Sequence, residues 1–176
     1  LDFYNQRRRQ VVQARPNSAH LALVELERRY KVSIVTQNVD DLHERAGSSS
    51  VLHLHGEIRK SRSTLDPSLV YPIENTELNL NDRCERGSQL RPHIVWFGEM
   101  VPALEKAAEI VSEADILLVV GTSLAVYPAA GLVDVVSPGC ERILIDPNAP
   151  AVASDFTLIR EPAGTGVPRW VHQLMQ

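Results

Sequence analysis

An uninterrupted apolar run in the second half of the chain limits the fold more than any other feature. Residues 115–123, DILLVVGTS, contain five consecutive branched aliphatic residues with no polar residue among them. A strand with one wet face would alternate apolar and polar residues, so this run predicts a strand that is buried on both faces of a parallel sheet. Parallel strands need long crossovers, and helical patterns flank the run. The sequence therefore indicates an α/β fold.

The rest of the chain repeats this alternation. Helical spacing of apolar residues predicts helices, the second of which Asn17 or Ser18 can cap. The helices are expected at 1–13, 17–30, 41–46, 102–114, 126–136 and 165–175, and strands at 31–38, 50–57, 92–99, 115–123 and 141–148. This order predicts a mainly parallel sheet with helices on both faces. Residues 58–90 have weak periodicity and are expected to form a loop-rich insertion.

Composition excludes several functional classes. The 176 residues are 44% hydrophobic and 23% charged, with a net charge of −4, so no basic surface for nucleic acid is indicated. No apolar stretch reaches 18 residues, and no membrane span is expected. We expect a cytoplasmic, monomeric protein.

Polar residues follow three of the predicted strands. The segments are Gln37–Asp40, Gly121–Ser123 and Asp146–Asn148. In parallel sheets, ligands bind beside the carboxyl ends of the strands, and hydroxyls, amides and a glycine backbone suit a ribose and phosphates. Polar residues also end many strands without any function, and Asp40 can equally cap the helix at 41–46. The coincidence of three such ends favours a nucleotide-type site.

Two histidines, His53 and His55, stand two positions apart just before Gly56. They can be metal ligands, a catalytic base, or two polar residues on one face of a strand. A metal pair is disfavoured because no nearby Cys, Asp or third His has ligand spacing. A neutral imidazole can accept a proton near pH 7 without a metal.

Five segments in a fixed order carry a family resemblance. They are FYNQRRR, TQNVDDLHERAG, HLHGE, RPHIVWFGE and GTSLAVYPAAG. Together they resemble the sirtuin family of NAD-dependent protein deacylases, and most closely its bacterial members that remove succinyl and malonyl groups. The resemblance runs from Leu1 to about Val167. It implies a Rossmann-type domain built from residues 1–57 and 91–176, with an acyl-recognising helix at 1–14 and a small inserted module at 58–90.

The resemblance also implies roles for individual residues. NAD is the expected cofactor, and acyl-lysine proteins (succinyl, malonyl or acetyl) are the expected substrates. His55 is the expected general base on a ribose hydroxyl, with Asn38 as a second catalytic residue, and Gly56 is expected to leave room for a ligand. The expected cofactor contacts are Gln37, Asn38, Val39, Asp40, Gly121, Thr122, Ser123, Asp146, Pro147, Asn148 and Ala163. Asp146 departs from the Asn-x-Glu that the family often has.

The segment VWFGE is expected to be the substrate strand, which pairs with an extended acyl-lysine peptide. Val95, Phe97, Gly98 and Glu99 are expected to flank the lysine. Trp96 and Phe97 can equally be core aromatics.

Acyl preference is expected to come from the first helix. Tyr4 and Arg7 share a helix face, and a phenol beside a guanidinium suits the carboxylate of a succinyl or malonyl group. Arg8, four residues after Tyr4, is equally close by spacing alone. The Tyr-x-x-Arg pattern of the family selects Arg7.

Two departures from the family pattern change the expectations. Ser63, Asp66 and Gly87 stand where three of four zinc cysteines would be, and only Cys84 remains. We therefore predict no zinc and no other metal. The module should then be held by apolar packing, for which the candidates are Leu65, Leu69, Val70, Tyr71, Ile73 and Leu78.

The second departure concerns the Gly-rich NAD loop of the family, which has no counterpart here, so we expect the chain to begin after it. The expected function is NAD-dependent lysine desuccinylation and demalonylation, with some deacetylation. Two alternatives remain: a non-catalytic fragment that binds acyl-lysine peptide, and a mono-ADP-ribosyltransferase.

Overall fold

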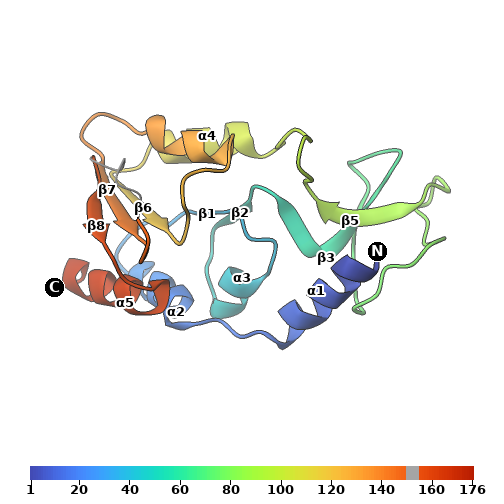
Figure 1. Ribbon diagram of the computed structural model, residues 1–176, viewed down its shortest axis with the longest axis horizontal. Coiled ribbons are helices and arrows are strands. Elements are labelled where there is room, and N and C mark those ends of the chain that lie inside the picture. Colours follow the sequence, from blue (N-terminus) through green and yellow to red (C-terminus); the bar gives the residue numbers. More distant parts are fainter. Residues whose placement is uncertain (150–154) are drawn as a thin grey trace.

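The computed structural model describes residues 1–149 and 155–176 (Figure 1). Its helices are α1 (Asp2–Gln13), α2 (Ser18–Leu26), α3 (Leu42–Ala46), α4 (Leu104–Ser112), the 3₁₀ helix η1 (Ala129–Asp134) and α5 (Ala163–Leu174). Its strands are β1 (Ile34–Thr36), β2 (Val51–His53), β3 (Gly56–Ser63), β4 (Val70–Pro72), β5 (Leu90–Ile94), β6 (Ile116–Val120), β7 (Glu141–Ile145) and β8 (Thr157–Ile159). Within the described ranges no helix is long and apolar enough to cross a membrane.

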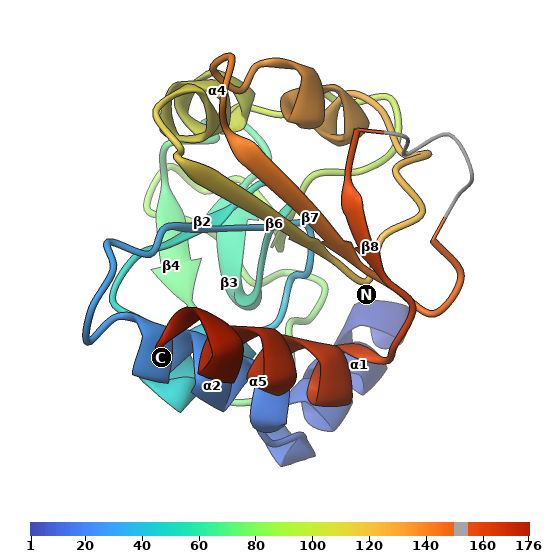
Figure 2. The same cartoon turned by 90° about the vertical axis from the view of Figure 1, so that its left-hand side faces the viewer.

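The parallel strands form two sheets rather than the one that the pattern predicts. β1 pairs with β2, and β6, β7 and β8 form a second parallel sheet in that order. Figure 2 shows these last three strands side by side. The apolar run at 115–123 is β6, as predicted, whereas β8 was not expected because only three residues pair.

Helices cover both faces of the β6–β7–β8 sheet, which confirms the predicted class (Figures 1 and 2). On one face α2 and α5 pack against β7 in a single cluster of buried residues: Ala19, Leu26, Ile143, Ile145, Val167 and Val171. On the other side, α4 and η1 pack beside β1 and β2 through Ala107, Ala129 and Leu54. Asn17 caps α2, with its side chain accepting from the backbone N–H of Ala19 at 2.9 Å. The segment predicted as a helix at 126–136 contains η1, which is a 3₁₀ helix.

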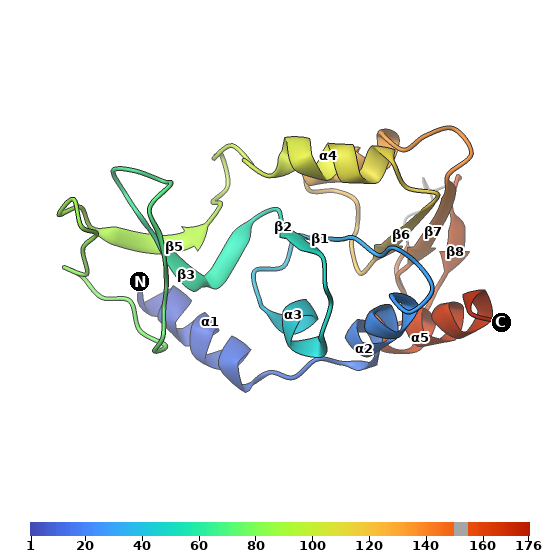
Figure 3. The same ribbon diagram turned by 180° about the vertical axis from the view of Figure 1, so that it is seen from behind.

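The inserted module is a small antiparallel sheet and not the loop-rich excursion that its weak periodicity indicates. Its strands lie in the order β4-β3-β5 (Figure 3). β3 reads GEIRKSRS, a sequence without apolar alternation and with little strand propensity. Pairing with β4 and β5 on either side makes it a strand, so the tertiary context overrides the local pattern.

The strand predicted at 50–57 divides between the two parts of the molecule. β2 ends at His53 in the parallel sheet, and β3 begins at Gly56 in the module. Gly56 has φ +84°, and a Cβ there would collide with the backbone oxygen of His93. The position therefore needs glycine because another backbone crosses it, and the prediction that Gly56 leaves room for a ligand is wrong.

Apolar packing in the module is smaller than predicted. Ile73 and Leu78 are buried, as expected, together with Ile58 and Cys84. Leu65, by contrast, is 67% exposed. Val70 is also exposed, while Leu69 and Tyr71 are partly buried. Leu65 lies in the turn after β3 and Val70 begins the outer strand β4, so neither faces the interior.

Hydrogen bonds join the turns that hold zinc cysteines in the resembled family. The hydroxyl of Ser63 accepts from the backbone N–H groups of Leu65 and Asp66, each at 3.1 Å. The thiol of Cys84 donates to the same hydroxyl at 3.4 Å. Among the described residues, no group of three or more His, Cys, Asp or Glu side chains is placed to hold a metal ion. A buried Ser–Cys hydrogen bond thus links the two turns directly.

Helix α1 is fastened to the module by two buried polar side chains. Arg8 is fully buried and donates through Nε to the carbonyl of Ile58 at 2.7 Å and through Nη1 to that of Thr76 at 3.0 Å. Asn5 exchanges two hydrogen bonds with the backbone of Leu78, at 3.0 and 3.1 Å. These contacts fix the orientation of α1, and with it the direction of Tyr4 and Arg7.

Replacing Arg8 should therefore be costly. We expect Arg8→Met to lower the free energy of unfolding by about 3 kcal/mol, because it leaves buried carbonyls without a donor. The exposed Arg9, which pairs with Glu77, is the matched control, and Arg9→Met should cost under about 1 kcal/mol. Urea unfolding of both variants measures the difference, and equal losses would contradict the anchoring role.

Candidate active site

The turn after β1 brings His55 against Gln37. Thr36 accepts from the backbone N–H of Asn38 at 3.0 Å and closes this turn. His55, just beyond β2, places Nδ1 at 3.2 Å from the carbonyl oxygen of Gln37. A carbonyl only accepts, so Nδ1 carries the hydrogen and Nε2 keeps its lone pair. The partly buried His55 is thus oriented to accept a proton at Nε2.

His53 is engaged at both ring nitrogens. Its Nδ1 lies 3.2 Å from the carbonyl oxygen of Asn38, and its Nε2 lies 2.7 Å from a carboxylate oxygen of Glu44. Regular pairing ends at His53, so the two histidines do not share one strand face. The interpretation of His53 as a structural histidine agrees with these contacts.

The remainder of this loop is held by the neighbouring elements. The carboxylate of Asp40 accepts from the backbone N–H of Leu42 at 3.1 Å, the helix-start contact that the sequence offered as an alternative role. The carbonyl of Val39 accepts from Ile58 at 2.8 Å and ties the loop to β3. Asn38 is exposed, whereas Gln37, Val39 and Asp40 are partly buried.

A second set of predicted residues lies where β6 and β7 end together. Val120 and Ile145 are register partners, so Gly121 and Asp146 leave the same edge of the sheet. Gly121 has φ +61°, and a Cβ atom there would meet nothing within 4 Å among the described residues, so its backbone faces open space. Thr122 accepts from Leu124 at 3.2 Å, and Asp146 accepts from Asn148 at 2.6 Å.

The other members of this set lie nearby in the chain. Ser123, Pro147 and Asn148 are exposed, and the partly buried Ala163 begins α5. An open glycine backbone, a hydroxyl and a carboxylate are groups that suit phosphates and a ribose. These residues therefore fit a nucleotide, and they occupy the sheet edge that the sequence predicts.

The expected substrate strand is a turn. β5 ends at Ile94, and the backbone N–H of Glu99 donates to the carbonyl of Trp96 at 3.0 Å across the turn, where Gly98 has φ +85°. The N–H of Val95 donates to the carbonyl of His55 at 2.9 Å, which places this turn beside the histidine. Phe97 is 97% exposed, so it is not a core aromatic.

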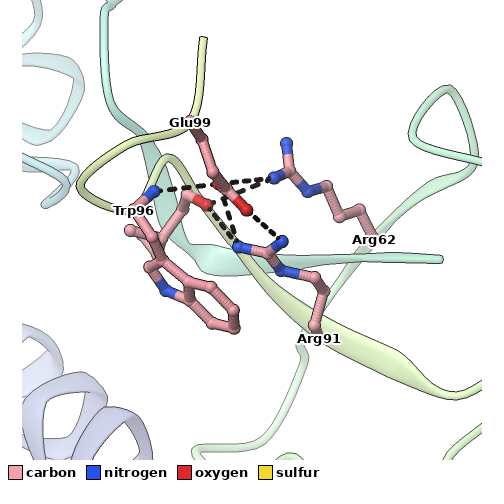
Figure 4. Close-up of polar contacts among 5 residues, drawn as sticks. Arg62, Arg91, Trp96 and Glu99 are labelled. Carbon is pink, nitrogen blue, oxygen red and sulfur yellow. Dashed lines mark hydrogen bonds and ion pairs between the residues drawn. The ribbon is translucent and has the colours of Figure 1, made fainter. Parts of the chain in front are cut away.

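Two arginines hold the carboxylate of Glu99 (Figure 4). Arg91 donates to both of its oxygens, at 2.6 and 3.2 Å, and Arg62 donates at 3.2 Å. The backbone N–H of Trp96 adds a fourth bond at 2.9 Å. Hydrogen bonding from Arg91, ahead of the other contacts, lowers the pKa of Glu99 to about 2. Glu99 thus fixes the turn, and its predicted contact with substrate stays a prediction.

The first helix reaches the same turn. The ring of Tyr4 stacks on Trp96, with centroids 6.4 Å apart and planes at 24°. Arg7 is exposed, beside the ring of Phe3 at 5.3 Å, whereas Arg8 is buried in its anchoring role. Spacing left Arg7 and Arg8 as alternatives, and the contacts leave Arg7 accessible. Sequence reasoning missed Arg62, Arg91 and the role of Trp96, because no periodicity marks residues that meet across two strands and a turn.

A nucleotide-type edge on parallel strands, a poised histidine and a second module beside it define an α/β enzyme of the nucleotide-dependent kind. The model of the Sir2 family matches residues 1–128. A curated relative, an NAD-dependent protein deacylase of Aggregatibacter actinomycetemcomitans, is 57% identical over 148 residues, which cover 84% of this chain and 71% of the relative. The chain belongs to the Sir2 family.

Solved structures agree with this assignment. A crystal structure of a Sir2 homolog–NAD complex matches with a TM-score of 0.89 at 40% identity, over 99% of this chain and 70% of that one. A structure described as Sir2 bound to acetylated peptide matches with a TM-score of 0.76 at 31% identity, over 94% and 72%. The chain thus spans about seven tenths of the length of these proteins.

The depressed pKa of Glu99 predicts a specific pH dependence. The stabilisation from this carboxylate is complete above its ordinary pKa of 4.5 and is lost as the pH falls toward about 2. We expect Glu99→Gln to be less stable than the wild type at pH 7, with a difference that shrinks between pH 4.5 and 2. Urea unfolding at several pH values measures it. Glu109→Gln, at an exposed carboxylate paired with Lys106, is the control, and a difference that grows on acidification would contradict the role.

Proposed function

We propose that the chain provides the catalytic base, the substrate turn and part of the NAD site of an NAD-dependent protein-lysine deacylase. The reaction transfers the acyl group from lysine to ADP-ribose and releases nicotinamide. The observation that carries the proposal is the orientation of His55, whose Nδ1 is held by the carbonyl of Gln37 so that Nε2 is left to accept a proton. The deacylase names of the curated relatives support the same reaction class.

NAD would supply an electrophilic ribose carbon and nicotinamide as the leaving group. Gln37, Asn38, Val39 and Asp40 would hold its nicotinamide and the adjoining ribose through amide, backbone and carboxylate groups. Gly121, Thr122 and Ser123 would contact the phosphate and adenosine side, and Asp146, Pro147, Asn148 and Ala163 the adenine ribose and base. His55 would remove a proton from a ribose hydroxyl through Nε2, and Asn38 would orient the reacting groups.

The proposed substrates are proteins that carry succinyl- or malonyl-lysine, with acetyl-lysine as a poorer substrate. Tyr4 and the accessible Arg7 lie on one face of α1 near the turn that ends in Glu99, and together they suit a terminal carboxylate. Val95, Phe97 and Gly98 would lie along the peptide. The division into residues 1–57, 58–90 and 91–176, the monomeric state and the cytoplasmic location also stay proposals.

The first experiment follows a succinyl-lysine peptide and its acetyl twin by mass spectrometry, with and without NAD. We expect NAD-dependent loss of succinyl that is faster than loss of acetyl, and no loss with His55→Tyr, because tyrosine cannot serve as the base. Circular dichroism confirms that the variant is folded. Transfer of ADP-ribose to the peptide would favour a mono-ADP-ribosyltransferase instead, and binding without turnover would favour a non-catalytic peptide-binding chain.

Arg7 tests the acyl preference. Arg7→Met should raise the KM for the succinyl peptide by about tenfold or more, since a charge-assisted bidentate pair is lost, and should leave the acetyl peptide nearly unchanged. Arg9→Met, two residues further along the same helix, should change neither value. Equal loss on both peptides with Arg7→Met would overturn the carboxylate-binding role.

A further inference from the structure

Trp96 is held in place although it is not buried. The residue is 42% exposed, yet its backbone N–H is bonded to Glu99 and its ring lies under the guanidinium of Arg91, 3.5 Å from the ring centroid. An exposed indole on a turn would otherwise be free to change rotamer. Here a charge-assisted contact on the ring and a hydrogen bond on the backbone act together, as Figure 4 shows.

Arg91 couples the two contacts. It donates to both oxygens of Glu99 and also stacks on Trp96, so one guanidinium fixes the turn and the ring that rises from it. A planar guanidinium can do both at once, which an ammonium group cannot. Arg91 is itself restrained, since it also donates to the carbonyl of Ile94 at 3.1 Å and its side chain is 17% exposed.

The ring of Trp96 in turn supports Tyr4. The two rings are stacked at 6.4 Å, and this contact joins helix α1 to the turn after β5. The anchors of α1, Asn5 and Arg8, lie toward the module and fix the helix axis. They leave the side chain of Tyr4 to be set by its own neighbours, of which Trp96 is one.

We propose that Arg91 is a specificity-determining positioning residue, which holds Trp96 as a platform for Tyr4 and so keeps the Tyr4–Arg7 pair oriented toward an acyl carboxylate. This inference rests on the proposed function, because it assigns a support to the acyl-recognising pair. It predicts that Arg91 matters more for carboxylate-bearing acyl groups than for acetyl groups.

Arg62 provides a matched control. Like Arg91, it donates to Glu99, at 3.2 Å, and to the carbonyl of Ile94, at 3.4 Å. The contact with the ring of Trp96 belongs to Arg91. Comparison of Arg91→Gln with Arg62→Gln therefore separates support of the ring from support of the turn, and Arg91→Lys tests whether charge alone is enough.

The experiment measures the dissociation constants of a succinyl-lysine peptide and its acetyl twin by fluorescence anisotropy, without NAD. We expect Arg91→Gln to weaken succinyl binding about fivefold more than acetyl binding, within the range of a partly exposed cation–π contact. Arg62→Gln should leave the ratio of the two constants within about twofold of the wild type. Arg91→Lys should resemble Arg91→Gln. In a Trp170→Phe background, acrylamide should quench Trp96 more readily in Arg91→Gln than in Arg62→Gln.

Equal weakening of both peptides by Arg91→Gln, or the same ratio change in both glutamine variants, would overturn the proposal. A wild-type chain that binds both peptides equally would overturn it as well, as would one that binds neither. These outcomes are distinct from failure of the proposed reaction, which is read from NAD-dependent turnover by mass spectrometry. Peptide discrimination that depends on Arg91 without any turnover would support this inference while rejecting the deacylase activity.

Discussion

The crossing of two backbones at Gly56 is the constraint on which the rest of the site depends. A side chain there would collide with the carbonyl of His93, so the chain can pass from the parallel sheet into the module only at a glycine. This crossing fixes His55 on one side, where Gln37 holds its ring. On the other side it sets the turn after β5, because the N–H of Val95 bonds to the carbonyl of His55. The proposed base and the proposed substrate turn are thus placed by the same contact.

Polar contacts carry much of the packing around this point. Arg8 and Asn5 join α1 to the backbone of the module, Ser63 and Cys84 join two of its turns, and Arg62 and Arg91 enclose Glu99. Buried polar groups of this kind must all be satisfied, since each one left without a partner is costly. A module with few buried apolar residues can therefore keep a defined shape, and that shape sets the directions in which Tyr4 and Trp96 point.

Much of the candidate site was predictable, because it sits at positions where chain order and strand direction determine the neighbours. Gln37 and Asp40 follow β1, and Gly121 and Asp146 leave two adjacent parallel strands. The roles of Gly56 and Glu99 were not predictable in this way. Gly56 answers to His93 and Glu99 to Arg62, and both partners come from strands that local pattern did not reveal or did not align.

The sequence by itself determined the α/β class, the buried strand at 115–123, the polar strand ends and the family motifs, because these follow from periodicity and from residue types close in the chain. Only the tertiary structure decided that residues 56–94 form an antiparallel sheet, that Arg8 is an anchor while Arg7 stays accessible, and that Trp96 lies between Arg91 and the first helix's Tyr4 in a chain of contacts. The physical reason is that strand pairing, burial of a guanidinium and stacking of rings depend on partners tens of residues away, which local spacing does not specify.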